Sequence, residues 1–213
     1  MFFKYGACEE FARLFVELAK TAGIDNARVV YNLGLDHAWA EVKINGDWIH
    51  VDPSKTNPAT GKRGIINDPA FYERPENENG GGEQLFFVYA VDDSGTAHDV
   101  TTRYVKRTGK LIISVRKENE PVPNARVRVV RTRSSAPFLT DENGACVFNL
   151  GEGEYKIIIE SGGMIGYRAE KIVRVTAGET SYENISLNEA ALLLPFFDPV
   201  FILLITLSCL VLL

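Results

Sequence analysis

An Asn-Gly pair at residues 45–46 constrains the fold more than any other feature of this sequence. Asn-Gly between two runs of alternating apolar residues is typical of a two-residue β-hairpin turn. The turn fixes which residues face each other, so Val42 pairs with Ile49 on an apolar face and Glu41 pairs with His50 on the other. A one-residue slip would exchange the two faces, and the pattern therefore predicts a single register.

The same register brings two further polar residues together. His37 opens the first strand and Asp52 closes the second, and both fall on the face that carries Glu41 and His50. Diagonal neighbours on one face of a hairpin are within reach of long side chains. We therefore expect the side chains of His37 and Asp52 to meet. The pairing of His50 with Glu41 favours a structural role for His50.

A helix is predicted upstream of the hairpin, from Cys8 to about residue 22. Its apolar residues recur at steps of three and four, which is typical of one buried face, and Gly23 suits a left-handed cap. The stripe consists of Phe11, Ala12, Leu14, Phe15, Leu18, Ala19 and Ala22. Cys8 then lies in the first turn, where unpaired N–H groups and the helix dipole favour a thiolate. Glu9 and Glu10 suit this turn but repel a thiolate locally.

Cys8, His37 and Asp52 occur in the order of a nucleophile, its base and the acid that orients the base. A single cysteine is more often a small buried hydrophobe, and a single strand histidine is more often structural. The combination, on compatible faces, favours a catalytic interpretation. N–H groups of the first helical turn would then form part of an oxyanion hole.

Three blocks of the chain resemble the core of the transglutaminase-like superfamily. They are Gly-Ala-Cys-Glu-Glu-Phe-Ala at residues 6–12, Asp-His-Ala-Trp-Ala-Glu-Val at residues 36–42 and Gly-Asp-Trp-Ile-His-Val-Asp-Pro at residues 46–53. Asp-Val-Thr-Thr-Arg-Tyr at residues 99–104 is similar to a segment of the peptide:N-glycanase branch. The three-block combination is specific, and the resemblance covers about half of the chain, residues 6–104.

This resemblance implies an α+β, papain-like core in which a helix packs on an antiparallel sheet. It implies Cys8 as the nucleophile, His37 as the base and Asp52 as the residue that orients it. The superfamily includes protein cross-linking acyltransferases, amide-cleaving glycanases and cysteine proteases. Only seven residues precede Cys8, where the family usually has helices and a residue that completes the oxyanion hole, so we expect an N-terminally truncated core. The Cys-x-x-Cys zinc motif of cytosolic glycanases is absent from the sequence.

Residues 54–84 are rich in Asn, Pro, Gly and charge without periodicity, which predicts a long loop. Residues 77–82 are expected to be its most mobile part. A substrate-binding lid is one interpretation, and a solvated insertion is favoured over it. An apolar strand is predicted over residues 84–91, and a second strand is predicted to run through about Tyr104. His98 in this hairpin is expected to be structural.

A domain boundary is predicted near residue 108, between a core over residues 1–108 and an all-β sandwich over residues 109–188. The expected strands are residues 111–115, 125–130, 145–149, 155–160 and 172–175. Residues 110–187 are similar to carboxypeptidase regulatory-like, transthyretin-like domains, whose usual role is structural or adhesive. The similarity is carried by Pro-Asn-Ala-Arg-Val at residues 123–127, Thr-Asp-Glu-Asn-Gly at residues 140–144 and Gly-Glu-Tyr at residues 153–155.

Charge and cysteine usage exclude several classes of function. The net charge is −5, and no basic run interleaves with aromatic residues, so nucleic-acid binding is disfavoured. Arg126 and Arg128 alternate with valines and are expected to form the solvent face of one strand. Cys8, Cys146 and Cys209 are too far apart for a disulfide framework or a metal cluster. The sequence carries no cofactor motif, and we expect neither a cofactor nor a metal.

The carboxyl-terminal segment is the most apolar part of the chain. Residues 190–213 contain a single charged residue, Asp198. This length is enough to cross a bilayer as a helix, and we expect a transmembrane anchor over residues 189–213. No Lys or Arg follows Arg174, so the positive-inside rule gives no orientation. A reduced nucleophile fits a cytosolic face, whereas a β-sandwich of this kind is commoner outside, and we expect both domains to be extracellular.

Together these features predict a membrane-anchored cysteine enzyme that acts on protein-linked amides. The substrate would be a protein or a glycopeptide, and hydrolysis is favoured over transfer to an acceptor amine. The alternative is a catalytically idle surface binding or scaffold protein that retains the fold. The reactivity of Cys8 discriminates between the two, because an idle site would carry an ordinary thiol.

Overall fold

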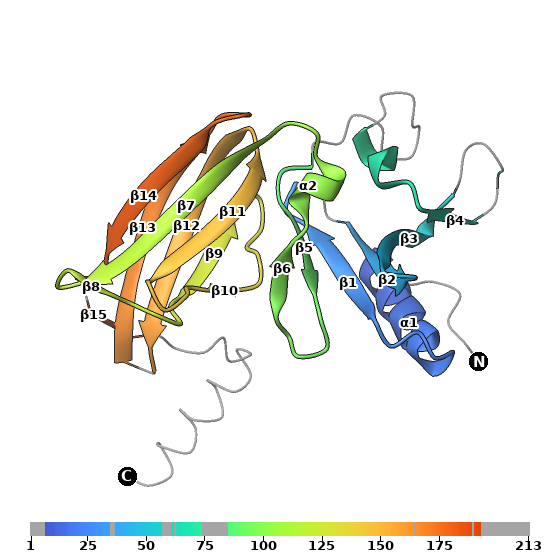
Figure 1. The fold of residues 1–213 in the computed structure, drawn as a ribbon, viewed down its shortest axis with the longest axis horizontal. Helices are drawn as coiled ribbons and strands as arrows, with labels where there is room; N and C mark the ends of the chain where they lie inside the picture. Colours follow the sequence, from blue (N-terminus) through green and yellow to red (C-terminus); the bar gives the residue numbers. More distant parts are fainter. Residues whose placement is uncertain are drawn as a thin grey trace, which may run out of the picture.

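The computed structural model describes residues 7–34, 37–56, 61, 63–73, 85–163, 165–188 and 190–192. These residues form two regions (Figure 1). In the first region, helix α1 (Cys8–Thr21) packs on a six-stranded antiparallel sheet, and in the second, two sheets form a β-sandwich. The described chain is therefore mostly β-strand with one amino-terminal helix, which is compatible with the predicted α+β core followed by an all-β region.

The six-stranded sheet has the strand order β4-β3-β2-β1-β5-β6. Its strands are β1 (Ala27–Asn32), β2 (Ala38–Ile44), β3 (Asp47–Thr56), β4 (Arg63–Ile66), β5 (Val88–Val91) and β6 (Ala97–Asp99). The predicted hairpin register is confirmed, because Val42 pairs with Ile49 and Glu41 pairs with His50. Both residues of the 45–46 turn have positive φ angles, 52° and 94°, as in a type I′ turn, one of the two common two-residue hairpin turns.

Helix α1 has the predicted limits, and Gly23 follows it with a φ of +87°. Its buried face is narrower than predicted. The contact is made by Ala12, Val16 and Ala19 of the helix and by Ala38, Ala40, Val42 and Val51 of the sheet. Leu14 and Leu18 of the predicted stripe are 54% and 59% exposed. Small residues on both sides bring the helix close to the sheet, so side chains away from the contact line remain in solvent.

The prediction of an unstructured loop over residues 54–84 is wrong where the structure describes that segment. Strand β3 continues to Thr56, β4 pairs with β3, and the 3-10 helix η1 (Pro69–Glu73) follows. Elements of four and five residues are too short to give a periodic sequence pattern. The segment expected to be most mobile, residues 77–82, lies outside the described residues.

The hairpin of β5 and β6 is present, but β5 begins at Val88 rather than near residue 84, and β6 ends at Asp99 rather than near Tyr104. The short helix α2 (Thr101–Tyr104) replaces the end of the predicted strand. An Asp99 carboxylate oxygen accepts a hydrogen bond from Thr101 N at 2.9 Å, which favours a turn over continued strand pairing. His98 Nε2 lies 2.7 Å from Asp92 Oδ2 within the same hairpin, in keeping with a structural role.

The sandwich combines a five-stranded sheet of order β10-β9-β12-β13-β15 with a four-stranded sheet of order β11-β7-β14, in which β7 also pairs with β8. The strands are β7 (Thr108–Lys117), β8 (Glu120–Pro121), β9 (Arg126–Val130), β10 (Phe138–Leu139), β11 (Ala145–Gly151), β12 (Gly153–Gly162), β13 (Ile165–Val175), β14 (Thr180–Ser186) and β15 (Ala190–Leu192). The five predicted strands are present. The sequence did not predict β8, β10, β14 or β15, and β14 pairs with β7 in parallel.

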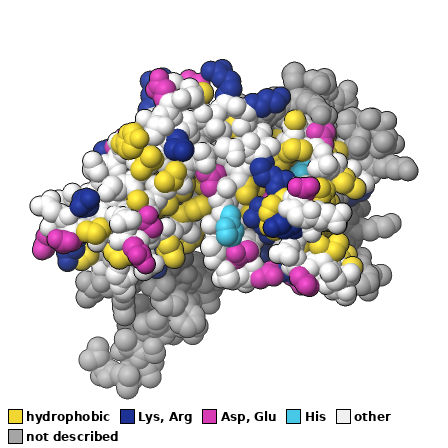
Figure 2. Space-filling model, in the orientation of Figure 1, with side chains coloured by type: hydrophobic (Ala, Val, Ile, Leu, Met, Phe, Trp, Pro, Cys, Tyr) yellow, Lys and Arg dark blue, Asp and Glu magenta, His cyan; other side chains and the backbone are white. Residues whose placement is uncertain are grey.

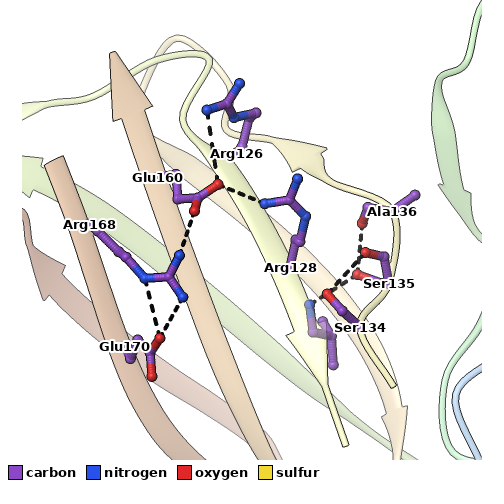
Figure 3. Close-up of polar contacts among 9 residues, drawn as sticks. Arg126, Arg128, Ser134, Ser135, Ala136, Glu160, Arg168 and Glu170 are labelled. Carbon is purple, nitrogen blue, oxygen red and sulfur yellow. Dashed lines mark hydrogen bonds and ion pairs between the residues drawn. The ribbon is translucent and has the colours of Figure 1, made fainter. Parts of the chain in front are cut away.

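The outer face of the five-stranded sheet carries a cluster of ion pairs centred on Glu160 of β12 (Figure 3). Its carboxylate lies 2.7 Å from Arg128 Nη1, 2.6 Å from Arg168 Nη1 and 3.9 Å from Arg126 Nη2. Arg126 and Arg128 thus lie on the solvent side of their strand, as predicted. Figure 2 likewise shows acidic and basic side chains interspersed on the face it displays.

One apolar cluster crosses the predicted boundary near residue 108. Phe87, which directly precedes β5, and Tyr89 of β5 belong to the same cluster as the interior of the sandwich. The Phe87 ring lies 5.5 Å from that of Phe138 and 5.7 Å from that of Phe148. Gly151 N also donates a hydrogen bond to the Phe86 carbonyl at 2.6 Å. The two regions therefore share part of their core.

The first residues of the predicted membrane anchor, Ala190–Leu192, form β15 and pair with β13. The rest of the predicted anchor, residue 189 and residues 193–213, lies outside the described residues. Among the residues that are described, no helix has the length and apolar character needed to cross a membrane.

Candidate active site

His37 and Asp52 meet at one end of the β2–β3 hairpin. His37 directly precedes β2, Asp52 lies in β3, and His37 Nε2 is 2.6 Å from Asp52 Oδ2. The other oxygen of the carboxylate, Oδ1, accepts hydrogen bonds from Ser54 N at 2.9 Å and from Ser54 Oγ at 2.7 Å. Asp52 is fully buried, so these bonds and not water orient its carboxylate.

The two groups stabilise each other in their charged forms. Burial alone would raise the pKa of Asp52, but hydrogen bonds from His37, Tyr72 and Ser54 lower it to about 2. Burial likewise opposes charge on His37, yet hydrogen bonds with Asp52 and Cys8 raise its pKa to about 9. Both shifts favour an imidazolium paired with a carboxylate.

Cys8 is the first residue of α1 and is partly buried. A hydrogen bond with His37 lowers the pKa of its thiol; burial opposes this shift, and backbone hydrogen bonds with Ala38 and Glu9 add to it. Because His37 Nε2 faces Asp52, the nitrogen left to face Cys8 is Nδ1. The three residues singled out in the sequence thus lie together as thiol, imidazole and carboxylate.

Glu9 and Glu10, the acidic residues next to Cys8, each accept hydrogen bonds from nearby groups. Glu9 Oε1 accepts hydrogen bonds from Arg13 Nε at 2.9 Å and from Tyr31 Oη at 3.0 Å. Glu10 Oε2 accepts one from Ala7 N at 2.7 Å, at the start of the helix. The local repulsion of a thiolate that the sequence predicts is therefore offset by a guanidinium and by two hydrogen-bond donors.

Tyr72 is a site residue that the sequence did not indicate. Its hydroxyl donates a hydrogen bond to Asp52 Oδ2 at 2.7 Å, and its side chain is fully buried. It belongs to η1, inside the segment predicted to be a loop. Tyr72 lies 20 residues after Asp52 in the sequence, and nothing in local periodicity links two residues that far apart.

His50, for which the sequence favours a structural role, contacts Tyr72. Its Nε2 lies 3.0 Å from the Tyr72 hydroxyl. Burial lowers the pKa of His50 to about 4, with a further contribution from the charge of Arg103. A neutral, fully buried imidazole in this position is in keeping with the structural role that the sequence favours.

A second buried carboxylate, Glu41, anchors the strands behind the site. Glu41 Oε2 accepts hydrogen bonds from Arg28 Nε at 2.8 Å and Nη2 at 2.7 Å. Glu41 Oε1 accepts one from Tyr104 Oη at 2.7 Å and lies 3.2 Å from Arg103 Nη1. The Arg28 guanidinium also lies 3.7 Å above the Trp48 ring. These contacts of Glu41 and Arg28 link β1, β2, β3 and α2 next to His50, the residue that pairs with Glu41.

The described residues contain no group of three or more His, Cys, Asp and Glu side chains arranged to hold a metal ion. Cys146 lies in the sandwich and is buried, which raises the pKa of its thiol to about 12. Its environment therefore opposes thiolate formation, whereas that of Cys8 favours it. The chemistry that this site supports is nucleophilic attack by sulfur, assisted by a charged imidazole.

Comparison with known proteins points to the same part of the chain. Residues 1–53 match the family model of the transglutaminase-like superfamily. A peptide-N(4)-(N-acetyl-beta-glucosaminyl)asparagine amidase of Caenorhabditis briggsae is 32% identical over 113 residues, which are 52% of this chain and 16% of that protein. Both matches support the transglutaminase-like resemblance of the core, and this chain spans only that small share of its relative.

Solved structures give weaker matches. The minor pilin GBS52 of Streptococcus agalactiae aligns with 81% of this chain and 84% of its own, at 13% identity and a TM-score of 0.36. The Bacillus anthracis TIE protein aligns with 75% of this chain and 34% of its own, at 12% identity and a TM-score of 0.34. TM-scores this low do not indicate a shared fold. The similarity of residues 110–187 to carboxypeptidase regulatory-like domains stays a prediction.

Proposed function

We propose that this protein is a cysteine-dependent enzyme that cleaves or transfers protein-linked amide groups. The observation that carries the proposal is the arrangement of Cys8, His37 and Asp52. A thiol with a lowered pKa shares a hydrogen bond with an imidazole whose Nε2 is 2.6 Å from a buried carboxylate. The family match of residues 1–53 supports a reaction of this kind.

The reaction would begin with attack of the Cys8 thiolate on the amide carbonyl carbon, which forms a C–S bond and moves charge onto the carbonyl oxygen. N–H groups in the first turn of α1 would stabilise that oxygen. His37 then gives its proton to the leaving nitrogen as the C–N bond breaks, leaving a thioester on Cys8. Neutral His37 next takes a proton from water or an amine, whose attack releases the acyl group and restores the thiolate.

The proposed substrate is an amide on a protein or a glycopeptide. The name of the Caenorhabditis briggsae relative describes an amidase acting on N-acetylglucosaminyl asparagine, and we extend that substrate class to this chain as part of the proposal. Hydrolysis is the favoured outcome, because water is the acceptor present at the highest concentration.

The pH dependence of Cys8 alkylation tests the proposal. Iodoacetamide should label Cys8 in the full-length chain well below the ordinary thiol pKa of roughly 8.5, and His37→Ala should slow this labelling. Mass spectrometry of the separated peptides distinguishes Cys8 from buried Cys146, which serves as an internal control, and Cys8→Ser should remove the signal. Release of glycan from a glycopeptide by the wild type but not by Cys8→Ser would then identify the reaction.

Labelling that rises only near the ordinary thiol pKa and does not depend on His37 would contradict the enzyme proposal. The idle binding or scaffold protein would then be the better description. It would explain the sandwich and the shared core without any need for a charged thiolate.

We also propose that residues 193–213, which follow β15, attach the protein to a membrane, with residues 1–188 on the outer surface. The support is compositional, since this stretch has a single charged residue, Asp198. Release of the full-length chain from membranes by alkaline carbonate would contradict attachment. Digestion of residues 1–188 by protease added to intact cells would support the outer location.

A further inference from the structure

The oxygen of Asp52 that faces His37 has a second hydrogen-bond donor. Asp52 Oδ2 lies 2.6 Å from His37 Nε2 and 2.7 Å from the Tyr72 hydroxyl that donates to it. The other oxygen, Oδ1, is occupied by Ser54. Two donors on one carboxylate oxygen share its charge. A stronger hydrogen bond from Tyr72 therefore weakens the attraction of Asp52 for the proton on His37.

His50 sets the direction of this hydrogen-bond chain. A tyrosine hydroxyl has one proton, and that of Tyr72 is directed to Asp52, so His50 Nε2 must be the donor to the Tyr72 oxygen. His50 Nδ1 is then the unprotonated nitrogen, and it is buried without a hydrogen-bond partner among the described residues. The chain of donors therefore runs from His50 through Tyr72 to Asp52.

The surroundings hold Tyr72 in place. Its ring stacks on Trp39 at 4.6 Å between centroids and meets Phe71 edge-on at 5.4 Å. All three side chains are buried. Aromatic packing of this kind fixes the ring plane, so the hydroxyl cannot leave Asp52 without moving the core behind the site.

We propose that Tyr72, held by His50, is a positioning residue that moderates the pull of Asp52 on His37, so that His37 can release its proton to a leaving amine. This inference rests on the proposed function. A general acid works best when its own affinity for the proton is not too high. With Asp52 Oδ2 shared between two donors, His37 remains charged beside Cys8 yet able to give up its proton.

Tyr72→Phe removes the one hydroxyl and keeps the ring. The measurement is the titration of His37 by NMR in the full-length chain with labelled histidine, which is tractable because the protein has three histidines. Without the bond from Tyr72, more charge remains on Asp52 Oδ2, and we expect the pKa of His37 to rise by about 0.5 or more. A pKa that is unchanged or lower would overturn the proposal.

Tyr104→Phe is the matched control. Tyr104 is also buried, packs against Trp39 with ring centroids 5.0 Å apart, and donates to a buried carboxylate, Glu41, at 2.7 Å. It has no bond to Asp52, so this variant should lose stability in thermal unfolding without a change in the His37 pKa. If both variants shift the His37 titration equally, the effect is a general loss of packing and the proposal fails.

His50→Leu supplies a second variant in case Tyr72→Phe does not fold. Removing the donor behind Tyr72 weakens the polarisation of its hydroxyl, so the pKa of His37 should rise by less than in Tyr72→Phe. His50→Gln, whose side-chain amide can still donate to Tyr72, should restore the wild-type value. Equal His37 titrations in the leucine and glutamine variants would contradict the role assigned to His50.

Activity gives an independent readout. On a glycopeptide that the wild type cleaves, Tyr72→Phe should lower kcat by about tenfold with KM unchanged, because the hydroxyl acts on proton transfer and not on binding. If the wild type cleaves no such substrate, the proposed substrate fails, and the His37 titration still decides the role of Tyr72. If the wild type is active and Tyr72→Phe has the same kcat, the proposal is overturned.

Discussion

Glu41 and Glu160 each bind arginines, but one lies inside the first region and the other on the outer face of the sandwich. Glu41 is fully buried, and the side chain of its partner Arg28 is 10% exposed. The three arginines around Glu160 have side chains that are 29% to 42% exposed. Similar chemistry therefore has different consequences, since a buried charge that loses its partner cannot be hydrated, whereas a surface charge can.

The interior of the first region likewise contains more charged and polar residues than the interior of the sandwich. Among the described residues, the first region buries Arg28, Asn32, Glu41, His50, Asp52 and Thr101, whereas the buried polar residues of the sandwich are Ser135 and Thr140. Buried polar groups cost free energy unless each is hydrogen-bonded. The charged interior coincides with the candidate active site, where pKa values are shifted, and the sandwich has the apolar interior of a structural module.

Glu41→Gln is the change expected to separate the two regions most clearly. It leaves the Arg28 and Arg103 guanidinium groups without a countercharge, and we expect a loss of about 3 to 5 kcal/mol in the free energy of unfolding. Urea denaturation of the full-length chain measures this loss. A loss below about 1 kcal/mol would mean that the buried ion pairs of Glu41 contribute no more than surface ion pairs do. It would contradict the difference drawn between Glu41 and Glu160.

The pH dependence of the unfolding free energy tests a second buried carboxylate of the first region, Asp52. Its pKa is about 2 in the folded chain and 3.8 as an ordinary carboxyl. A lowered folded pKa contributes stability above the unfolded pKa, and this contribution is lost as the pH falls through the folded pKa. We expect about 2 kcal/mol of unfolding free energy to disappear between these two pH values.

The reference for this titration is Asp52→Asn, which has no carboxyl to protonate. The difference in unfolding free energy between wild type and this variant should shrink as the pH falls through that window. A difference that is constant with pH would show that Asp52 is not held as a carboxylate by its partners.

Glu160→Gln should have the smallest effect. The three arginines on the outer face of the sandwich remain hydrated after the change, and we expect a loss of about 1 kcal/mol or less in unfolding free energy. High salt should reduce this loss further, because exposed charges are screened. A loss as large as that of Glu41→Gln, measured by the same urea denaturation, would place the Glu160 cluster among the buried networks.

The sequence predicted well the parts of the site that depend on local rules. The Asn-Gly turn fixes the pairing of β2 with β3 and therefore the meeting of His37 and Asp52. The apolar periodicity sets the start of α1 at Cys8. Each of these signals spans a few residues, and each reports on one element or on one adjacent pair of strands.

The sequence could not predict what depends on long-range packing. Tyr72 reaches Asp52 from η1, and Tyr104 reaches Glu41 across 63 residues of sequence. Leu18 belongs to the periodic stripe of α1 but lies in solvent, because periodicity does not say how closely the helix approaches the sheet. The parallel partner of β7, strand β14, was missed for a similar reason, since no tight turn joins them.

Phe87 and Tyr89 limit how this molecule can be taken apart. A gene cut at codon 108 would leave their two rings uncovered on one piece and a matching gap beside Phe138 and Phe148 on the other. We expect neither piece to be a portable module. Transfer of the sandwich to another protein, whether by recombination or by engineering, would have to include Phe87 and β5. The segment that can be transferred is therefore longer than residues 110–187, which resemble a known domain.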